Sequence, residues 1–462
     1  MKEAKVLLVG GGAREHAIGE RLVNEGAVLS VVASNINPGL WNLVQGSGGT
    51  YFKASPTSPE EVLEAAKRAK PDLVVIGPEE PQFRGVVDKL LEAGFLVFGA
   101  TSKASEIEKS KVFARTLMKK YNIPGNLEFW YFESWKEAIE FLESAGNVAI
   151  KPARQAGGKG VKVISDMQAY LSEEKKKVKE IHAKRILEEV MAKYTDIKEK
   201  LLIEERVEGV EYTVQAFTDG EEVVPLPAIQ DNPHLFIYDV GPETGGMGTV
   251  QGPGRLLPFI TQEEYDFAVN ILKEVVKAIN KELGVKYVGA ISAQMMLTTK
   301  GPVLIEFYSR LGDPEAVNAM NVIEGSVLEA MFSAAQGNLS VKEFKVRDVA
   351  STVKCVAPMG YPERRDLAKG RELEIGDVEG CKLYFGSVDL KDGKMITGGS
   401  RAVEVYAEGS SITEAAERAN ACASKVGFKG WKAVWRPDIG TEWYLKKRIE
   451  TAELVRAVRS LR

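Results

Sequence analysis

Residues 303–317, VLIEFYSRLGDPEAV, combine an apolar run with charged groups of both signs. The apolar run indicates a buried strand with Glu306 at its end, and Arg310, Asp313 and Glu315 follow in a turn that contains glycine and proline. The ends of strands are where α/β proteins place their chemistry. A carboxylate on a buried strand needs a cation or a hydrogen-bond partner. Glu306 is therefore expected either to hold Mg2+ or to form a structural ion pair with Arg310.

A second motif, KPARQAGGKGVKVI, places Lys151 on an expected strand that leads into a glycine-rich loop. Consecutive glycines let backbone N–H groups approach phosphate oxygens closely, and two lysines there would neutralise a polyphosphate. The loop lacks the GxxxxGK[ST] pattern of a P-loop. Without other motifs, a mobile surface turn is the alternative. The loop residues that we expect to act are Gly157, Gly158, Lys159 and Gly160.

An acidic segment, EERVEGVE, follows the expected strand at residues 201–203. Its backbone around Glu204 and Val207 could contact a flat base, and Glu211 could accept hydrogen bonds from ribose hydroxyls. An exposed acidic hairpin explains the same residues equally well in isolation.

The N-terminal turn GGGAREHAIG resembles a dinucleotide fingerprint but departs from it twice. Glu15 stands where the third glycine belongs, and the next strand ends at Ser34 and Asn35 without an acidic residue for a ribose. A glycine turn at a helix N-terminus still offers N–H groups to a phosphate. The turn is either a phosphate-binding loop or a plain tight turn.

The elements that must position these residues begin with alternating strands and helices. Strands are expected at residues 6–9, 29–33, 73–76 and 96–99, with a helix at 14–24, which predicts a doubly wound parallel sheet. An α+β section follows, with helices at 106–121, 135–144, 173–193 and 261–283, and with a hairpin at 290–306. Strands at 350–357, 382–388 and 402–407 and a helix at 413–426 indicate a β-rich C-terminal domain.

Composition limits the function classes. The chain has 462 residues, 44% of them hydrophobic and 27% charged, and a net charge of −4, so no basic field favours nucleic acid or an anionic membrane. No apolar run reaches the roughly 20 residues that span a bilayer, and the glycine-interrupted start is not expected to be a signal peptide. The three cysteines form no CxxC pair, so we expect idle thiols in a reducing cytosol and no disulfide framework.

Together, the motifs GGGAREHAIGE, GPEEPQFRGVVD, SKVFARTLMKKYNIP, KPARQAGGKGVKV, IEERVEGVEYTVQ, QDNPH, GPETGGMG and EFYSRLGDPE resemble the glycinamide ribonucleotide synthetase family of the ATP-grasp superfamily. The resemblance covers essentially the whole chain, and the tail DIGTEWYLKKRI looks like archaeal members. It implies an α/β and α+β multidomain fold, with an N-terminal doubly wound parallel sheet, ATP-grasp central domains and a C-terminal β-rich domain. The expected boundaries are 1–104, 105–336 with a lid subdomain at about 122–204, and 337–462.

The resemblance also implies an ATP-dependent ligation of glycine to 5-phosphoribosylamine through a glycyl phosphate, with Mg2+ or Mn2+. Lys111, Lys151, Gly157, Gly158, Lys159 and Gly160 would bind the ATP phosphates, and Glu204, Val207 and Glu211 the nucleoside. Glu306 would hold the metal, and the catalytic residues would be Arg310, Lys151 and Asp231. The remaining candidates would bind the amine and the amino acid: Gly11, Gly12, Arg14, Asn37, Pro38, Gly39, Glu79, Gln230, Asp231, Gly245, Gly246, Met247, Asp313 and Glu315.

Two departures from the family pattern leave alternatives open. The usual EFN is Glu306-Phe307-Tyr308, so a phenol replaces an amide that would be a second metal ligand. A GPEAPL-like segment is GPEEPQFR, with more bulk and charge. A sister ATP-grasp ligase for another acid or amine, or an inactive nucleotide-binding paralogue, is therefore retained. A cytoplasmic monomer or weak homo-oligomer, with small-molecule substrates as its partners, is expected.

Overall fold

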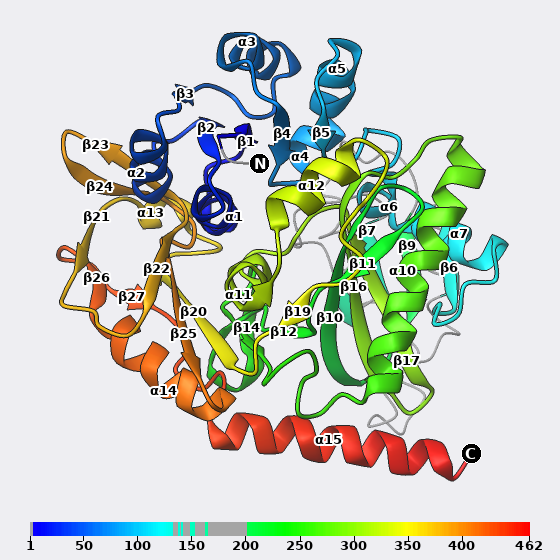
Figure 1. Ribbon diagram of the computed structural model, residues 1–462. Helices are drawn as coiled ribbons and strands as arrows, with labels where there is room; N and C mark the ends of the chain where they lie inside the picture. Colours follow the sequence, from blue (N-terminus) through cyan, green and yellow to red (C-terminus); the bar gives the residue numbers. More distant parts are fainter. Residues whose placement is uncertain (1–2, 133–136, 139, 142–147, 153–161, 165–200) are drawn as a thin grey trace.

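The computed structural model describes the chain except residues 1–2, 133–136, 139, 142–147, 153–161 and 165–200. The expected helix at 173–193 and the glycine-rich loop lie outside the described residues, as do six of the ten residues of the expected helix at 135–144, whose four described residues are helical. Five parallel strands, in the order β3-β2-β1-β4-β5, form the N-terminal sheet (Figure 1). This confirms the doubly wound sheet. Its strands are β1 (Lys5–Val9), β2 (Val28–Ala33), β3 (Tyr51–Lys53), β4 (Leu73–Ile76) and β5 (Val97–Phe98).

The strands β1 and β4 are apolar at nearly every position because helices cover both faces of a parallel sheet. The helices of this unit are α1 (Ala13–Asn24), α2 (Pro38–Ser47), α3 (Pro59–Ala69), α4 (Glu80–Phe83) and α5 (Val86–Glu92). The carboxyl ends of β1 and β4 carry the glycines of the first turn and of the GPEEPQFR segment. Both segments therefore lie at one edge of this sheet, beside the rest of the molecule.

The helix expected over residues 106–121 is two helices, α6 (Glu106–Lys109) and α7 (Lys111–Lys120). Ser110 is extended between them, and its hydroxyl accepts a hydrogen bond from the Phe113 N–H, so the serine caps a new helix instead of continuing the old one. This break brings Lys111 to the first turn of α7. The long helix α10 (Gln262–Leu283) begins as expected at Thr261, which forms a capping box with Glu264.

A small antiparallel sheet in the order β6-β9-β7-β8 precedes the large sheet of the molecule. Its strands are β6 (Phe129–Phe132), β7 (Val148–Pro152), β8 (Lys162–Ile164) and β9 (Leu201–Glu205). The large sheet runs in the order β17-β16-β10-β12-β15-β20-β25-β22, with β11 (Val223–Pro225) and β27 (Ala433–Val434) paired at its side. Its first strands are β10 (Gly209–Thr218), β12 (Ile229–Asp231), β15 (Gly248–Gln251), β16 (Gly289–Thr298) and β17 (Gly301–Tyr308).

Between β12 and β15 a short excursion leaves the large sheet, and between β17 and β20 the chain crosses to the C-terminal part. The excursion consists of β13 (His234–Phe236), the 3-10 helix η2 (Ile237–Asp239) and β14 (Val240–Glu243). The crossing contains α11 (Glu315–Val322), β18 (Ile323–Glu324), α12 (Val327–Ala335) and β19 (Lys345–Val346). The helix α11 packs against α1, so this crossing joins the N-terminal unit to the large sheet.

The C-terminal strands extend the large sheet rather than forming a sheet of their own: β20 (Ala350–Pro358) pairs with β15, and β25 (Val403–Gly409) and β22 (Lys382–Phe385) continue outward. The strand expected at 382–388 ends at Phe385, and β23 (Val388–Lys391) begins a second sheet after Gly386 and Ser387. That sheet also contains β21 (Lys369–Ile375), β24 (Lys394–Gly398) and β26 (Val426–Phe428). The C-terminal helices are α13 (Arg365–Ala368), α14 (Ile412–Ala423) and α15 (Glu442–Ser460).

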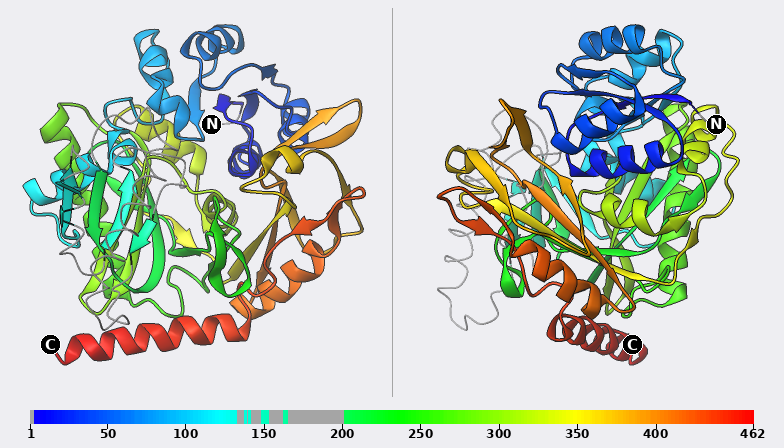
Figure 2. Two further views of the ribbon diagram at one scale, coloured as in Figure 1. Left: turned by 180° about the vertical axis from the view of Figure 1, so that it is seen from behind. Right: turned by 60° about the vertical axis from the view of Figure 1, so that its left-hand side comes forward.

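Seen together, the N-terminal unit rests on both the central part and the C-terminal part (Figure 2). The helix α15 returns beneath the large sheet, where it contacts β10, β16 and β17 (Figure 1). Within the described part of the chain, no helix is both long enough and apolar enough to cross a membrane.

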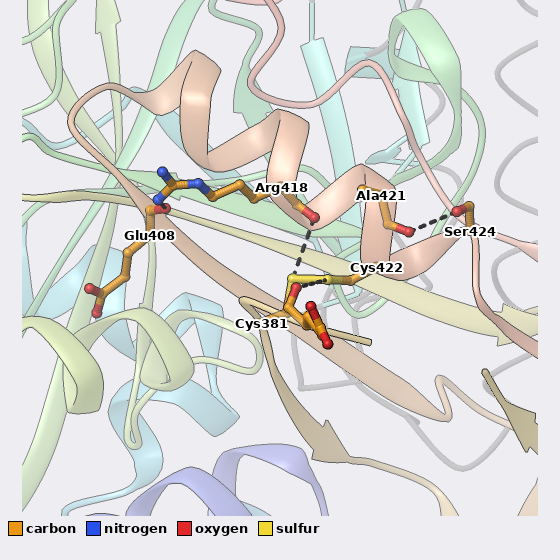
Figure 3. Close-up of a disulfide and its surroundings, with 7 residues drawn as sticks. Cys381, Glu408, Arg418, Ala421, Cys422 and Ser424 are labelled. Atoms are coloured by element: carbon orange, nitrogen blue, oxygen red, sulfur yellow. Dashed lines mark hydrogen bonds between the residues drawn. A yellow bond between two sulfur atoms is a disulfide. The ribbon is translucent and has the colours of Figure 1, made fainter. Parts of the chain in front are cut away.

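The expectation of idle thiols is wrong for two of the three cysteines. Cys381, before β22, and Cys422, in α14, form a disulfide across 41 positions of sequence (Figure 3). Cys355 is a buried free thiol. Sequence spacing could not show this pairing, because only the packing of α14 beside the β22 and β25 strands brings the two sulfur atoms together.

Candidate active site

A cavity of about 440 Å³ opens where β9, β10, β12, β16 and β17 meet the N-terminal unit. It gathers residues from segments that lie nearly four hundred positions apart in the sequence, from Arg14 to Arg401. Eleven of the residues singled out from the sequence line it: Arg14, Glu79, Glu204, Val207, Glu211, Asp231, Gly245, Glu306, Arg310, Asp313 and Glu315.

Glu306 lies near the end of β17, as expected, and its carboxylate is partly accessible from the cavity. The Lys111 ammonium lies 3.3 Å from Glu306 Oε1, and the Tyr308 hydroxyl donates a 3.2 Å hydrogen bond to Oε2. The phenol thus lies beside the carboxylate, not on the far side of the strand. Burial, followed by the charge of Glu306, raises the pKa of Tyr308, so the phenol remains a neutral donor.

The position of Arg310 is set by contacts with residues other than Glu306. Its guanidinium lies 3.3 Å from Glu79 and 3.4 Å from Glu108, and it stacks 4.3 Å from the centre of the Tyr308 ring. Burial opposes ionisation of Glu79, but Arg310 and Arg14 overcome it and hold the pKa of Glu79 below its usual value. Burial raises the pKa of Glu108 to about 7 despite Arg310. The arginine is therefore held as a fixed cation at the cavity wall.

Glu211 faces the same cavity from β10, and the neighbouring strand β16 carries Gln294. The Gln294 amide donates a 3.1 Å hydrogen bond to Glu211 Oε2 and accepts one from the Thr213 hydroxyl. Gln294 lies directly opposite Glu306 in the β16–β17 pairing. Burial, reinforced by Glu243, raises the pKa of Glu211 to about 7. Oxygen donors from three adjacent strands thus share one side of the cavity.

Glu204 is expected from the sequence to contact a base through its backbone, and its side chain has a structural role. Its carboxylate is buried and pairs with the Arg115 guanidinium at 2.7 Å. Arg115 also donates to the carbonyls of Leu304 and Ile305, so the pair joins α7, β9 and β17. The carboxylate therefore braces the strands that carry the site, and Val207 lines the cavity beyond it.

Asp231 is half-buried, and its buried Oδ1 atom has no hydrogen-bond partner within the described structure. Burial, together with the charge of Glu315, raises its pKa well above the ordinary value. Gly246, at φ +121°, passes so close that an added Cβ would lie 2.6 Å from Asp231 Oδ1. The glycine of the GPETGGMG motif is thus required by this approach, and it leaves a carboxyl group available to a ligand in the cavity.

A second cavity, of about 580 Å³, lies between the first glycine turn and the β23–β24 hairpin. Arg14, Asp313 and Arg401 line both cavities, so the two spaces adjoin. Lys369 and Lys391 add positive charge to the second cavity, and Ser387, Thr397 and Ser400 add hydroxyl groups. Glu15, Asp313, Asp389 and Glu404 line it as well, so the cavity carries charges of both signs.

The glycine turn contributes to the second cavity through Gly11, Gly12 and Arg14. The Gly12 N–H, however, donates to Glu15 Oε1 at 3.0 Å, and Arg14 Nε donates to Glu15 Oε2 at 2.6 Å. Glu15 replaces the fingerprint glycine because its carboxylate fills the space against Gly10 and Gly77. A phosphate would therefore meet Arg14 and the neighbouring backbone, but not an unused Gly12 N–H.

Six residues expected to touch substrate line neither cavity, and one of them is Gly246, whose approach to Asp231 is described above. Asn37 is fully buried, where its amide donates to the Gly11 and Phe385 carbonyls and its oxygen caps α2. Pro38 and Gly39 are the first residues of α2, and a Cβ at Gly39 would lie 1.9 Å from the His16 ring. Met247 belongs to the hydrophobic core, and Gln230 faces α15. These residues therefore serve folding. In this segment the residue that reaches the second cavity is Asn35, not Asn37.

Arg401 is a site residue that the sequence analysis missed. It donates to the Gly245, Gly246 and Asp313 carbonyls at 3.1, 3.0 and 2.7 Å, so it joins the GPETGGMG and RLGDPE loops. Burial opposes the ionisation of Asp313, but Arg401 and a hydrogen bond from Glu404 hold its pKa at about 2. The available signal was an arginine and a glutamate in SRAVEV, which otherwise alternates as a strand.

The side chain of Lys151, on β7, and the loop residues Gly157, Gly158, Lys159 and Gly160 lie outside the described residues. Within the described ranges, no group of three or more His, Cys, Asp or Glu side chains could hold a metal by itself. Mg2+ nevertheless needs only one or two protein carboxylates when substrate phosphates and water supply the remaining ligands. The hard oxygen donors of Glu306 and Glu211 fit such a cation.

The sheet arrangement and the cavity define an ATP-grasp enzyme, and comparison with known proteins agrees. The ATP-grasp (A) domain model of phosphoribosylglycinamide synthetase matches residues 109–316, its N domain model matches 4–108 and its C domain model matches 351–442. The chain belongs to the phosphoribosylglycinamide synthetase family.

Relatives and solved structures give the same result. A phosphoribosylamine–glycine ligase of Methanopyrus kandleri is 42% identical over 461 residues, 98% of this chain and 99% of that protein. One of Pyrococcus horikoshii is 40% identical over 96% of this chain and 97% of that protein. The crystal structure of the Thermotoga maritima phosphoribosylamine–glycine ligase aligns with a TM-score of 0.76 at 28% identity, over 94% of this chain and 100% of that one. A Campylobacter jejuni biotin carboxylase, at 13% identity and a TM-score of 0.71, shares the fold.

Proposed function

We propose that the protein joins glycine to 5-phosphoribosylamine at the expense of ATP, giving glycinamide ribonucleotide, ADP and phosphate through a glycyl phosphate. The observation that carries the proposal is the adjoining pair of cavities. One is lined by the segment from Glu204 to Val207, by further carboxylates and by arginines, which suit ATP and an acid. The other combines cationic, acidic and hydroxyl side chains beside the N-terminal glycine turn, where a phosphorylated sugar would lie. Arg14, Asp313 and Arg401, which line both, mark the place where the amine would meet the activated acid.

ATP and Mg2+ or Mn2+ would occupy the cavity of about 440 Å³ that lies at the strands β9, β10, β12, β16 and β17. Glu306 would hold the metal, with Glu211 or water completing its oxygen ligands, and Lys111 would turn from Glu306 to the phosphates. When bound, the cation would neutralise charge on the phosphate oxygens. Tyr308 keeps its hydrogen bond to Glu306, so a phenol orients the carboxylate where relatives in this family are expected to use an amide ligand.

Activation of the acid requires that charge on the transferred phosphoryl group be stabilised. A glycine carboxylate oxygen attacks the γ-phosphorus, and the bond to the ADP oxygen breaks. Arg310 is supported for this role by its fixed position between Glu79 and Glu108, because a donor that does not have to reorganise stabilises a transition state most effectively. Lys151 and the loop residues 157–160 are proposed to contact the same phosphates.

In the second step the amine attacks the acyl carbon, the carbon–nitrogen bond forms and phosphate leaves. The nitrogen loses one proton in this step. Asp231 is proposed to receive it, because its buried Oδ1 has no other partner in the described structure and faces the cavity in which the amine would lie. Glu315 and Gly245 would complete the wall around the amine and the amino acid.

The second cavity is proposed to hold the phosphoribosyl group, with Gly11, Gly12 and Arg14 on one side and Lys369 and Lys391 on the other. The division at 1–104, 105–336 and 337–462 is also proposed, and the ranges matched by the three family models support it. We further propose a cytoplasmic enzyme that acts as a monomer or weak homo-oligomer on small molecules.

Steady-state ADP release tests the proposal with each substrate omitted in turn. Release that requires both glycine and 5-phosphoribosylamine, with glycinamide ribonucleotide as the product, is expected. Turnover with a different acid or amine would identify a sister ligase. Tight ATP binding without turnover would identify an inactive nucleotide-binding relative.

A further inference from the structure

The C-terminal helix α15 lies almost wholly beyond residue 442, the last residue matched by the family models. It runs beneath the large sheet, on the side of β10 and β16 (Figure 1). Two of its side chains, Tyr444 and Arg448, point into the molecule. Tyr444 is fully buried, and the Arg448 guanidinium stacks 3.8 Å from the centre of its ring.

These two side chains converge on two amide groups at the end of β12. The Tyr444 hydroxyl is within hydrogen-bond reach of the amide oxygens of both Gln230 and Asn232, the second at 2.8 Å. Arg448 donates to the same two oxygens at 3.1 and 3.2 Å. A single phenolic hydrogen can serve only one oxygen, so Arg448 supplies the remaining donors. A 2.8 Å bond from Arg448 to Asp239 fixes the guanidinium further.

The amide nitrogens of the same two residues point the other way, into the sheet. Gln230 Nε2 donates to the Glu211 carbonyl at 2.8 Å, and Asn232 Nδ2 donates to the Gly248 carbonyl at 3.1 Å. Each amide therefore connects α15 to the backbone of a neighbouring strand. All four polar groups of the two amides are in use, which leaves them little freedom to rotate.

Asp231 lies between these two anchored residues. Because side chains alternate along an extended chain, fixing Gln230 and Asn232 toward α15 directs Asp231 to the opposite face, where it lines the cavity. Asp231 has no hydrogen bond of its own at Oδ1 that would set this direction. The Asn232 N–H contacts its carboxyl group, and Asp231 lies opposite Thr249 in the β12–β15 pairing, so its placement depends on this backbone pairing and on the anchored neighbours together.

We infer that Tyr444 and Arg448 are positioning residues that hold residues 230–232 so that Asp231 faces the reacting groups. This inference rests on the proposed function for its kinetic consequences. The helix is thus a part of the active-site support and not only a cover for the sheet. A misplacement of about 1 Å at a reacting group can lower the rate by about a hundredfold, so loss of two amide anchors is expected to be measurable.

The test uses the full chain carrying Tyr444→Phe, Arg448→Met or both. Each single variant is expected to lower kcat for ligation about tenfold while KM for ATP changes less than twofold, because the contacts of the nucleotide lie on other strands. Arg448→Lys should recover part of the loss, since a lysine can reach one amide oxygen. Amide exchange over residues 229–232 should become faster in both single variants.

Arg456→Met is the matched control. Arg456 lies on the same helix and anchors it to Glu264 at 2.8 Å and to the Phe259 carbonyl at 2.7 Å, away from β12. It should lower the melting temperature but leave kcat within twofold of the wild type. An equal fall in kcat for Arg456→Met would show that helix docking in general, and not local positioning, is responsible.

Unchanged kcat and unchanged exchange in Tyr444→Phe and Arg448→Met would overturn the inference. The exchange measurement does not depend on which acid or amine is the substrate. If the wild-type protein proved inactive with glycine and 5-phosphoribosylamine, the proposed function would fail, and the exchange results would still decide whether α15 holds this segment.

Discussion

At the scale of single residues, Glu306 shows how a strand end becomes a binding group. The strand β17 buries its apolar residues and delivers one carboxylate near its end, where Lys111 and Tyr308 contact it. The lysine neutralises the buried charge, and the phenol restricts the carboxylate's orientation. Both partners can be replaced by a bound cation and its phosphate ligands without leaving the carboxylate unpaired.

Glu306→Gln is expected to be severely impaired, because an amide cannot supply the negative charge that a divalent cation requires. Tyr308→Phe should retain activity but need a higher Mg2+ concentration, since Glu306 loses the hydrogen bond that orients it. Tyr308→Asn is expected to be neutral or activating. Initial rates measured against Mg2+ concentration check all three variants. Abolished activity in Tyr308→Asn would point to a positive role for the phenol in a different acceptor pocket.

Arg310 has a different dependence on its surroundings, since it is the counter-ion of Glu79 and Glu108. Arg310→Ala is expected to lower kcat by about 10²–10³, equivalent to about 2.7–4 kcal/mol of barrier, as found for loss of one preorganised donor. Near wild-type turnover at saturating ATP would exclude the assigned role.

The same substitution leaves the buried carboxylate of Glu108 and the half-buried one of Glu79 without this cation, so some loss of stability is expected as well. The double variant Arg310→Ala with Glu108→Gln removes one of these unpaired charges. It should recover melting temperature but not kcat, which separates catalysis from folding.

At the scale of elements, helix α1 and strand β22 meet through His16. Its Nδ1 accepts a 3.1 Å hydrogen bond from the Phe385 N–H, and its ring stacks on Phe385 and meets Tyr384 edge to face. Burial, only partly offset by Glu20, lowers the pKa of His16 to about 4. The imidazole is therefore neutral in the folded protein, as its acceptor role requires.

Because the unfolded chain binds a proton at His16 near pH 6.5 and the folded protein only near pH 4, stability should fall as pH decreases through this window. The contribution present above pH 6.5 and lost by about pH 4 is on the order of 3 kcal/mol. Urea unfolding between pH 7.5 and 4 measures it. His16→Gln keeps an acceptor oxygen but does not titrate, so its stability should depend less steeply on pH; an unchanged slope would contradict the assignment.

At the scale of the whole molecule, the large sheet joins the catalytic strands to the C-terminal part, and the Cys381–Cys422 disulfide ties α14 to the strand that ends this sheet. The loop that it closes spans 41 positions, for which chain-entropy arguments give about 2–4 kcal/mol. A rigid C-terminal part helps to keep the second cavity in shape, because the nearby strands β23 and β24 form one of its walls.

Thiol titration of the unreduced, denatured protein should detect one free thiol per chain, that of Cys355. Reduction should raise the count to three and lower the melting temperature. The variant Cys381→Ser with Cys422→Ser should melt at the lower temperature with or without reductant. Three reactive thiols before reduction would mean that the disulfide does not form in the protein as purified.

Much of the candidate site could be predicted from the sequence because its signals are local. A strand end with Glu306, and the capping serines and threonines that precede α3, α7, α10, α12, α14 and α15, depend on neighbours a few residues away. Eleven of the residues that the family motifs single out line the main cavity.

What the sequence could not decide is which distant groups meet. Arg310 pairs with Glu79 and Glu108, about two hundred positions earlier, and Asn37 turns to the backbone while Asn35 faces the second cavity. Arg401, the disulfide and the contacts of α15 with β12 likewise depend on packing between separate elements. The chain by itself determined the kind of chemistry, since residue type and local spacing carry it. Only the tertiary structure decided which side chains support that chemistry, because burial and charge pairing arise when remote segments come together.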